Sequence, residues 1–117
     1  MSEQALTGVR ILDFSQVLAG PFATQLMAQL GAQVIKVEQP VGGDMTRGLM
    51  SASSDGMAPS FLAANLGKRS LTLDLKNPKV KEIVHKLVAE ADVLVENFKP
   101  GTIERLGFGF EAMKAIK

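Results

Sequence analysis

The sequence predicts an α/β fold, Rossmann-like, with a mostly parallel sheet and helices on both faces. Apolar, β-branched runs alternate with helical patterns along the chain, which is the order that builds such sheets. The first strand, helix and second strand fit within about 30 residues, the size of a βαβ unit with parallel strands. With 117 residues, 46% of them hydrophobic and 21% charged, the chain has the composition of one ordinary globular domain.

The first βαβ unit is predicted from three patterns. Residues 9–14 form an apolar run typical of a buried strand, and residues 34–37 form a second one that ends at Glu38. Between them, Pro21 suits the first turn of a helix and Gly31 suits a helix end. The apolar residues between these two positions have the spacing of one amphipathic stripe: Phe22, Ala23, Leu26, Met27 and Leu30.

The pattern lapses at residues 39–58, where we expect a long loop. A loop of about 20 residues is uncommon in a compact domain and is usually functional or disordered. A short helix is expected at residues 59–66. Residues 71–75 alternate strictly, so Leu71, Leu73 and Leu75 are expected to share one face of a third strand.

The rest of the chain repeats the helix and strand pattern. Asn77 and Pro78 are a good cap and first turn for a helix. Its apolar stripe comprises Val80, Ile83, Val84, Leu87, Val88 and Ala91. Residues 92–96 predict a fourth strand, which is followed by a helical turn at 102–106 and by a helix that opens at Glu111.

The predicted topology nominates four segments for ligand binding. In parallel sheets, ligands bind beyond the carboxyl ends of the strands. The segments that follow the four strands are 15–20, 39–47, 76–77 and 97–101.

Each candidate group has a functional and a purely structural interpretation. The turn at 18–21 could bind an anion at a helix N-terminus or be a plain turn. The loop at 42–47 could close over a ligand through Asp44 and Arg47, or be a surface loop. Lys68 and Arg69 could hold phosphate, although a two-residue run more often forms a solvated turn. Phe98 could stack on a base or anchor the core.

A dinucleotide site is a weaker alternative. Glu38 follows the first turn by about 20 residues, the position of the ribose-binding acid in such folds. The G-x-G-x-x-G fingerprint is missing, however, because residues 17–22 contain one glycine and a proline.

Several chemistries are disfavoured. The chain has no cysteine, so thiol catalysis and sulfur-ligated metals are absent. Its one histidine, His85, falls on the polar flank of a predicted helix, so we expect no metal. We assign no catalytic residue, because none of the five aspartates lies beside an evident activating group: Asp13, Asp44, Asp55, Asp74 and Asp92. We expect a cytoplasmic protein that binds neither membrane nor nucleic acid, because long apolar runs and clustered basic residues with stacking aromatics are missing.

Seven motifs in order resemble the N-terminal part of the class III CoA-transferase family, which includes formyl-CoA and carnitine CoA-transferases and the α-methylacyl-CoA racemases. The motifs extend from Leu6 to about Met113. They are Leu6–Phe14, Leu18–Pro21, Leu30–Glu38, Gly43–Arg47, Gly67–Lys76, Ala91–Phe98, and Pro100–Gly101 followed by Glu104–Gly107.

The resemblance implies a coenzyme A site, with CoA bound as an acyl-CoA substrate. Carried over position by position, it assigns CoA contacts to residues at three strand exits and to one later cation. These are Leu18, Ala19, Leu73, Asp74, Leu75, Lys76, Asn97, Phe98, Lys99 and Arg105.

The resemblance also implies a reaction and an assembly. Family transferases move CoA between an acyl-CoA and a carboxylic acid through an aspartate that forms anhydride and CoA-thioester intermediates. That aspartate, or the histidine and aspartate pair of the racemases, is expected beyond Lys117, so residues 1–117 are expected to be the N-terminal part of the CoA-binding domain, inactive alone. Full-length members form interlocked homodimers. A racemase fragment and a non-catalytic CoA- or nucleotide-binding module stay open as alternatives.

Overall fold

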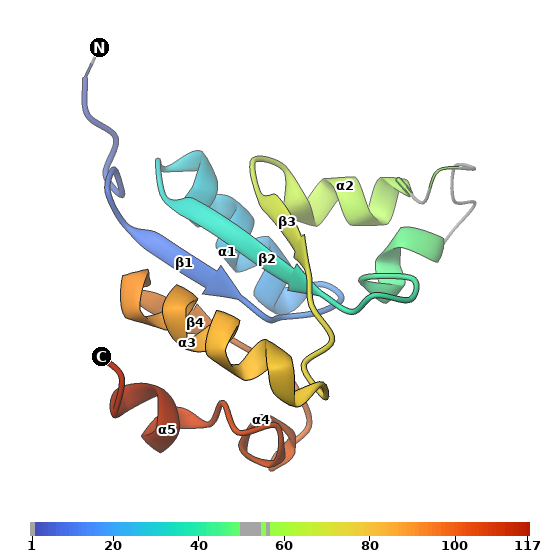
Figure 1. Cartoon of the computed structure of the whole chain (residues 1–117). Coiled ribbons are helices and arrows are strands. Elements are labelled where there is room, and N and C mark those ends of the chain that lie inside the picture. The colour runs from blue at the N-terminus through green and yellow to red at the C-terminus, as the bar shows by residue number, and fades with distance from the viewer. Residues whose placement is uncertain (1, 50–54, 56) are drawn as a thin grey trace.

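The computed structural model describes residues 2–49, 55 and 57–117 (Figure 1). Four parallel strands form one sheet in the order β3-β2-β1-β4. The strands are β1 (Arg10–Asp13), β2 (Gln33–Glu38), β3 (Arg69–Thr72) and β4 (Val93–Val95). The helices are α1 (Ala19–Gln29), α2 (Pro59–Asn65), α3 (Lys81–Glu90), α4 (Thr102–Arg105) and α5 (Phe110–Lys114), with short 3-10 turns at η1 (Met45–Gly48) and η2 (Pro78–Val80). The predicted fold class is confirmed.

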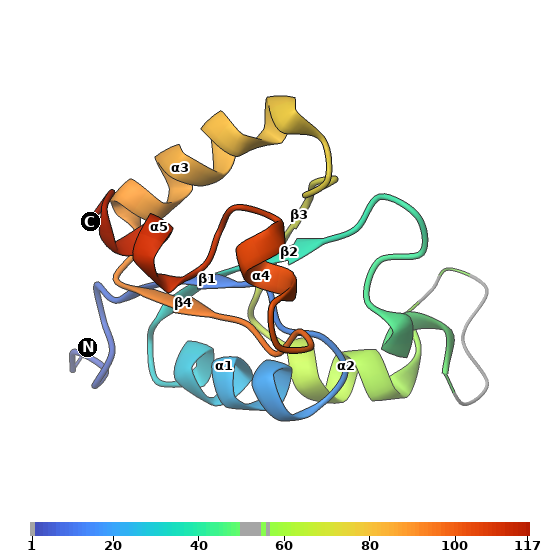
Figure 2. The same ribbon diagram turned by 90° about the horizontal axis from the view of Figure 1, so that it is seen from below.

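The helices cover both faces of the sheet, as predicted. Figure 2 shows α1 and α2 on one side and α3, α4 and α5 on the other. The main apolar cluster lies between the sheet and the second group of helices. It contains Leu12, Phe14, Val37, Leu73, Val80, Val84, Val88, Ile103, Phe108 and Met113.

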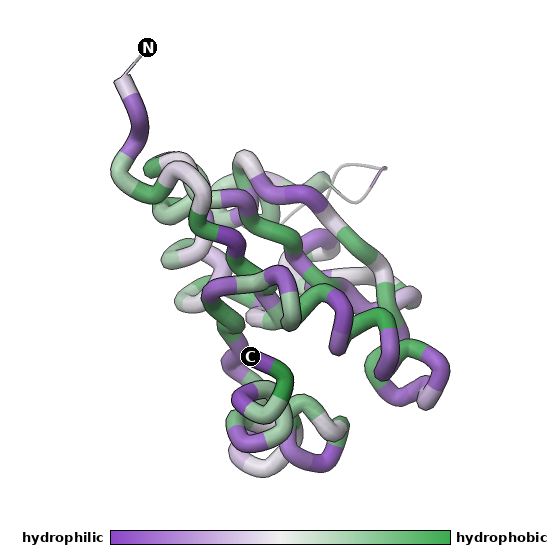
Figure 3. Tube along the Cα trace, turned by 60° about the vertical axis from the view of Figure 1, so that its left-hand side comes forward, coloured by the Kyte–Doolittle hydropathy of each residue, from purple (hydrophilic) through white to green (hydrophobic). Residues whose placement is uncertain are grey.

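The opposite face of the sheet carries buried polar and charged side chains. Strand residues alternate between faces, so Asp13, Lys36 and Glu38 point away from the apolar cluster that Leu12 and Val37 join. Charged residues therefore interrupt the hydrophobic stretches of β1 and β2 (Figure 3). A small second cluster of Ile11, Ala32 and Val34 packs apolar atoms on this side.

Helix α1 contradicts the predicted direction of its apolar stripe. Phe22, Leu26 and Leu30 are about half exposed, whereas Thr24 and Gln25 are buried. The physical reason is that α1 faces the charged side of the sheet. Its most deeply buried residues, Thr24 and Gln25, therefore form hydrogen bonds, while Met27 of the predicted stripe does pack inward, on the small cluster of Ile11, Ala32 and Val34. The helical period alone does not specify which side faces inward.

Two glycines explain how the chain enters and leaves α1. A Cβ atom on Gly20 would lie 2.4 Å from Ser15 Cβ, so the first turn of α1 can approach the loop only without a side chain. Gly31 has a φ of 103°, a left-handed conformation that suits the end of a helix, as predicted.

The other elements lie close to their predicted positions. Leu71, Leu73 and Leu75 all pack on the main apolar cluster as predicted, although β3 itself ends at Thr72. The Asn77 side chain accepts a hydrogen bond from Lys79 N (3.0 Å), confirming the predicted cap. In α3, Ile83 is exposed although the stripe included it.

The chain exposes more surface than its mass predicts. A compact monomer of 12.5 kDa is expected to expose about 6,200 Å², whereas this structure exposes 7334 Å². Within the described part of the chain, no helix combines the length and apolar character needed to span a membrane.

Candidate functional site

A cleft lies where the strands end at their carboxyl side, the position at which parallel sheets bind ligands. Its volume of about 700 Å³ is within the range of small-molecule sites. Each of the four nominated segments contributes to it. The lining residues are Gln16, Val37, Glu38, Gln39, Pro40, Val41, Met45, Leu73, Asp74, Leu75, Lys76, Phe98, Thr102 and Leu106.

Half of the predicted CoA contacts line this cleft. Those that do are Leu73, Asp74, Leu75, Lys76 and Phe98, and those that do not are Leu18, Ala19, Asn97, Lys99 and Arg105. Phe98 both lines the cleft and packs against the main apolar cluster, so its two interpretations are compatible.

The polar groups near the cleft differ in how they are held. Lys76 N–H donates to Asp74 Oδ1 (3.0 Å), so the acid shapes the turn after β3, and the Lys76 side chain is exposed. Arg105 Nη2 donates to Thr102 Oγ1 (3.0 Å), and Thr102 lines the cleft. Arg105 therefore lies next to a lining residue without lining the cleft itself.

Asn97 fixes the loop between β1 and α1. Its Oδ1 accepts from Gln16 N (2.8 Å), and its Nδ2 donates to Gln16 O (2.7 Å). Because both ends of the amide are engaged, Asn97 holds the Gln16 backbone beside the cleft. The side-chain amide of Asn97, which the resemblance assigns to CoA, here positions the Gln16 backbone.

Glu38 cannot act as a ribose-binding acid in this structure. Arg47 Nε and Nη2 each lie 2.8 Å from its carboxylate, Ser70 Oγ donates to it, and Asp44 N donates at 2.9 Å. Burial raises the pKa of Glu38, but the hydrogen bonds from Arg47, Ser70 and Asp44 N outweigh it and lower the pKa to about 2. The dinucleotide alternative therefore loses its acidic residue.

The two charged side chains of the 42–47 segment, Asp44 and Arg47, point away from the cleft, although Met45 of the same segment lines it. Arg47 binds Glu38 and stacks on Phe61, with its guanidinium carbon 3.7 Å from the ring centroid. The Asp44 side chain caps η1 by accepting from Thr46 N (3.0 Å). Neither charge is presented to the cleft, so closure over a ligand through these two residues is not supported.

Two further ion pairs lie buried beneath α1 and η1. Lys36 Nζ lies 2.8 Å from Asp44 Oδ2, with 1% and 0% of the two side chains exposed. Lys68 Nζ lies 3.0 Å from Asp13 Oδ2 and is equally buried, so the prediction of a solvated turn was wrong for Lys68. Burial lowers the pKa of Lys68, and Asp13 opposes that effect.

These pairs place a lysine beside two of the five aspartates, Asp13 and Asp44, to which no catalytic role was assigned. Burial raises the pKa of Asp44, but hydrogen bonds from Lys36 and Thr46 outweigh it and lower the pKa overall. Asp13 also accepts from Thr24 Oγ1 (2.6 Å) and Ser15 N (2.9 Å). Both carboxylates are saturated by internal donors, so they stabilise the fold and are not available to attack a substrate.

The sequence missed several residues that line the cleft. Gln16, Met45 and Thr102 follow or flank predicted strand exits, so their segments were found although the individual side chains were not. Only the direction in which each loop turns distinguishes a lining residue from its neighbours.

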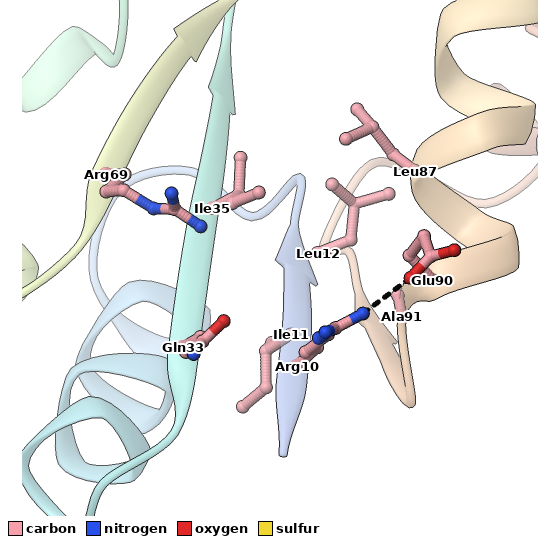
Figure 4. Close-up of a pocket in the computed structure, with 9 residues that line it drawn as sticks. All are labelled: Arg10, Ile11, Leu12, Gln33, Ile35, Arg69, Leu87, Glu90 and Ala91. Carbon is pink, nitrogen blue, oxygen red and sulfur yellow. Dashed lines mark hydrogen bonds and ion pairs between the residues drawn. The ribbon is translucent and has the colours of Figure 1, made fainter. Parts of the chain in front are cut away.

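A second, smaller pocket of about 270 Å³ lies toward the amino ends of the strands, between the sheet and α3 (Figure 4). Ile35, Leu12 and Leu87 supply apolar side chains, and Arg10 forms an ion pair with Glu90. It lies away from the carboxyl edge and contains none of the predicted CoA contacts. In the described part of the chain, no group of three or more acidic or histidine side chains could hold a metal ion.

The sheet and cleft define a Rossmann-like α/β domain with its candidate ligand site at the usual edge. A sequence model described as CoA-transferase family III matches residues 6–117, and the chain belongs to this family. It is 52% identical over 113 residues to a formyl-CoA:oxalate CoA-transferase of Bradyrhizobium diazoefficiens, covering 97% of this chain and 27% of that protein.

Solved structures of related proteins share the fold of this chain. The crystal structure of a CAIB/BAIF family protein from Brucella suis superposes with a TM-score of 0.90 at 42% identity, covering 98% of this chain and 31% of that one. A hypothetical protein of Mycobacterium tuberculosis, Rv3272, superposes with a TM-score of 0.86 at 43% identity, covering 96% and 30%. The chain thus spans about a quarter of the length of the curated relatives and corresponds to their N-terminal portion.

Proposed function

We propose that this chain is the CoA-binding part of a CoA-transferase that moves CoA between an acyl-CoA and a carboxylic acid in the cytoplasm. The observation that carries the proposal is the 700 Å³ cleft at the ligand edge of a chain that belongs to this family. The name of the relative that is 52% identical supports the transferase over the racemase alternative.

In this proposal the cleft binds the CoA moiety. Phe98 offers an aromatic face in the cleft wall, and Lys76 offers an exposed ammonium group beside it. Lys99 and Arg105 are exposed cations on the loop and helix that follow β4, where they can attract the CoA phosphates. Leu18 and Ala19 bring the first turn of α1 toward the same edge.

The covalent chemistry is assigned to an aspartate outside these 117 residues. Its carboxylate attacks the acyl-CoA carbonyl and the C–S bond breaks. CoA thiolate is released, and the acyl group and the aspartate are joined as a mixed anhydride. The thiolate then attacks the aspartyl carbonyl and releases the donor acid, and the acceptor carboxylate reverses both steps. Asp13 and Asp44 do not fit this role, because each is buried and paired with a lysine.

Calorimetric titration of the chain with CoA and with NAD tests the binding site. We expect saturable CoA binding that is several-fold weaker in Lys76→Ala, and a loss that shrinks as salt screens the phosphate contact. Lys86→Ala is the matched control, because it removes the same charge from α3 outside the cleft. Selective NAD binding, or equal CoA affinity in both variants, contradicts the proposal.

We also propose that the exposed apolar stripe of α1 is covered in the assembled enzyme, which we expect to be a homodimer. Leu18, Phe22, Leu26 and Leu30 are 45–61% exposed at a spacing of four residues, and Leu62 and Leu66 of the α2 region are also exposed. Sedimentation of the chain alone should show self-association that Leu26→Ser reduces. A monodisperse monomer at high concentration argues against this assembly.

A further inference from the structure

Val17 has an unusual backbone conformation next to the cleft. Its φ is 70°, and in the described part of the chain it is the only residue other than glycine with a positive φ. A β-branched side chain disfavours this left-handed region, so the conformation persists only where the surroundings impose it. The side chain is 38% exposed, so burial of Val17 does not by itself explain the conformation.

Side chains from distant elements hold the backbone from Ser15 O to Val17 N, and two of them, Lys36 and Asp44, are buried. Val17 N lies 3.3 Å from both carboxylate oxygens of Asp44. Lys36 Nζ donates to Ser15 O (2.9 Å) and also pairs with Asp44. Asn97 holds both backbone groups of Gln16. Side chains of β2, of the η1 cap and of the segment after β4 therefore fix four backbone groups: Ser15 O, Gln16 N, Gln16 O and Val17 N.

Asp44 is itself held in one position. Thr46 N and Oγ1 donate to Asp44 Oδ1 at 3.0 and 2.8 Å, and Lys36 binds the other oxygen. A carboxylate with this many donors cannot turn away from Val17 without leaving a buried charge unpaired, which is strongly unfavourable. The pair therefore imposes one geometry on the loop between β1 and α1.

The geometry points to Lys36 and Asp44 as positioning residues: they impose the left-handed conformation on Val17, which sets the direction of Leu18 and Ala19. Asn97 holds the neighbouring Gln16 at the cleft. A ligand then binds a preformed loop and loses less conformational entropy on binding. This inference rests on the proposed CoA site for its effect on binding, but the control of the Val17 conformation by Asp44 stands separately.

The test combines Asp44→Asn with Val17→Gly. Glycine adopts positive φ without strain, so it no longer needs Asp44 to hold the loop. We expect CoA binding to weaken about tenfold in Asp44→Asn, to change less than about twofold in Val17→Gly, and to recover to within about threefold of wild type in the double variant. A role of Asp44 in stability alone would not be rescued by a glycine at position 17, so an unrescued double variant overturns the inference.

Backbone NMR chemical shifts of Val17, which report φ, provide a readout that does not require CoA. We expect Asp44→Asn to move these shifts toward values for negative φ, and unchanged shifts overturn the inference whether or not CoA binds. Absence of CoA binding in the wild type, with shifts that do respond, contradicts only the proposed function.

Two variants keep the test informative. Thr46→Val removes one donor to Asp44 but keeps the Lys36 pair, so it serves if Asp44→Asn does not fold, and its Val17 shifts should move less in the same direction. Thr24→Val is the matched control, because it removes a buried hydrogen bond to Asp13 that does not touch residues 16 or 17. Val17 shifts that change as much in Thr24→Val as in Asp44→Asn contradict a specific role for Asp44.

Discussion

Leu12 and Asp13 are neighbours in β1 and both are buried, yet they face opposite sides of the sheet and are stabilised by different interactions. Leu12 packs in the apolar cluster beneath α3. Asp13 binds Lys68 beneath α1, with hydrogen bonds from Ser15 and Thr24.

The difference shows how one sheet combines two tasks. An apolar face is non-directional, so it stabilises the sheet without specifying where a loop lies. An ionic face is directional, because each buried charge needs partners at defined positions. The directional face lies beneath the loop between β1 and α1, which leads to the cleft.

The largest effect is expected from breaking the ionic face. Asp13→Ala leaves Lys68 buried without its charged partner, with only Pro21 O and Asn65 Oδ1 to accept its hydrogen bonds. We expect a loss of about 4 kcal/mol in the free energy of unfolding, measured with denaturant. Leu12→Ala on the apolar face should lose about 3 kcal/mol through the cavity it creates. A loss below about 1 kcal/mol for Asp13→Ala would show that the pair is not buried in solution.

The next largest effect is expected from lowering the pH, which should weaken the ionic face and leave the apolar face unchanged. The pKa of Glu38 is about 2 in the folded chain against 4.5 normally, so its contribution is complete above pH 4.5 and disappears as pH falls through about 2. The stability difference between wild type and Glu38→Gln should shrink by roughly 3 kcal/mol between pH 6 and pH 2. The difference between wild type and Leu12→Ala should stay constant over that range.

Double-variant cycles sharpen the contrast. Asp13→Asn with Lys68→Met should lose less than the sum of the two single losses, with a coupling energy of about 2 kcal/mol, because the two share one ion pair. Leu12→Ala with Lys68→Met should be additive within about 0.5 kcal/mol, because Leu12 packs in the apolar cluster and Lys68 pairs with Asp13 on the opposite face. Equal coupling in both cycles would contradict separate faces.

The smallest effect is expected where charges are exposed. Arg10 pairs with Glu90 at the surface, where solvent screens the interaction. Arg10→Ala should change the free energy of unfolding by less than about 1 kcal/mol, and thermal unfolding measured with and without added salt should show little difference from wild type. A loss as large as that of Asp13→Ala would contradict the distinction between buried and exposed pairs.

Much of the fold could be predicted because its signals are local. The alternation of Leu71, Leu73 and Leu75 correctly predicted a shared face, and Asn77 predicted the start of a helix through its own cap. The four strand exits correctly located the cleft, because parallel strands bring their carboxyl ends to one edge.

The ionic face could not be predicted from the same signals. Lys68 and Asp13 are 55 residues apart, and no periodic pattern joins them. A lysine next to an arginine in a turn is usually solvated, so only the approach of the turn to β1 shows that Lys68 is buried. The outward apolar stripe of α1 was missed for a related reason, because the charged sheet face beneath the helix selects Thr24 and Gln25 as its inward residues.

The sequence by itself determined the order of elements, the parallel sheet and the edge at which the cleft lies, because strand and helix periods and turn residues act over a few positions. Only the tertiary structure decided which charges are buried, which side of α1 faces the sheet and why Val17 adopts a positive φ. Those outcomes depend on donors and acceptors brought together from distant strands, since a buried charge is stable only where its partners are already in place.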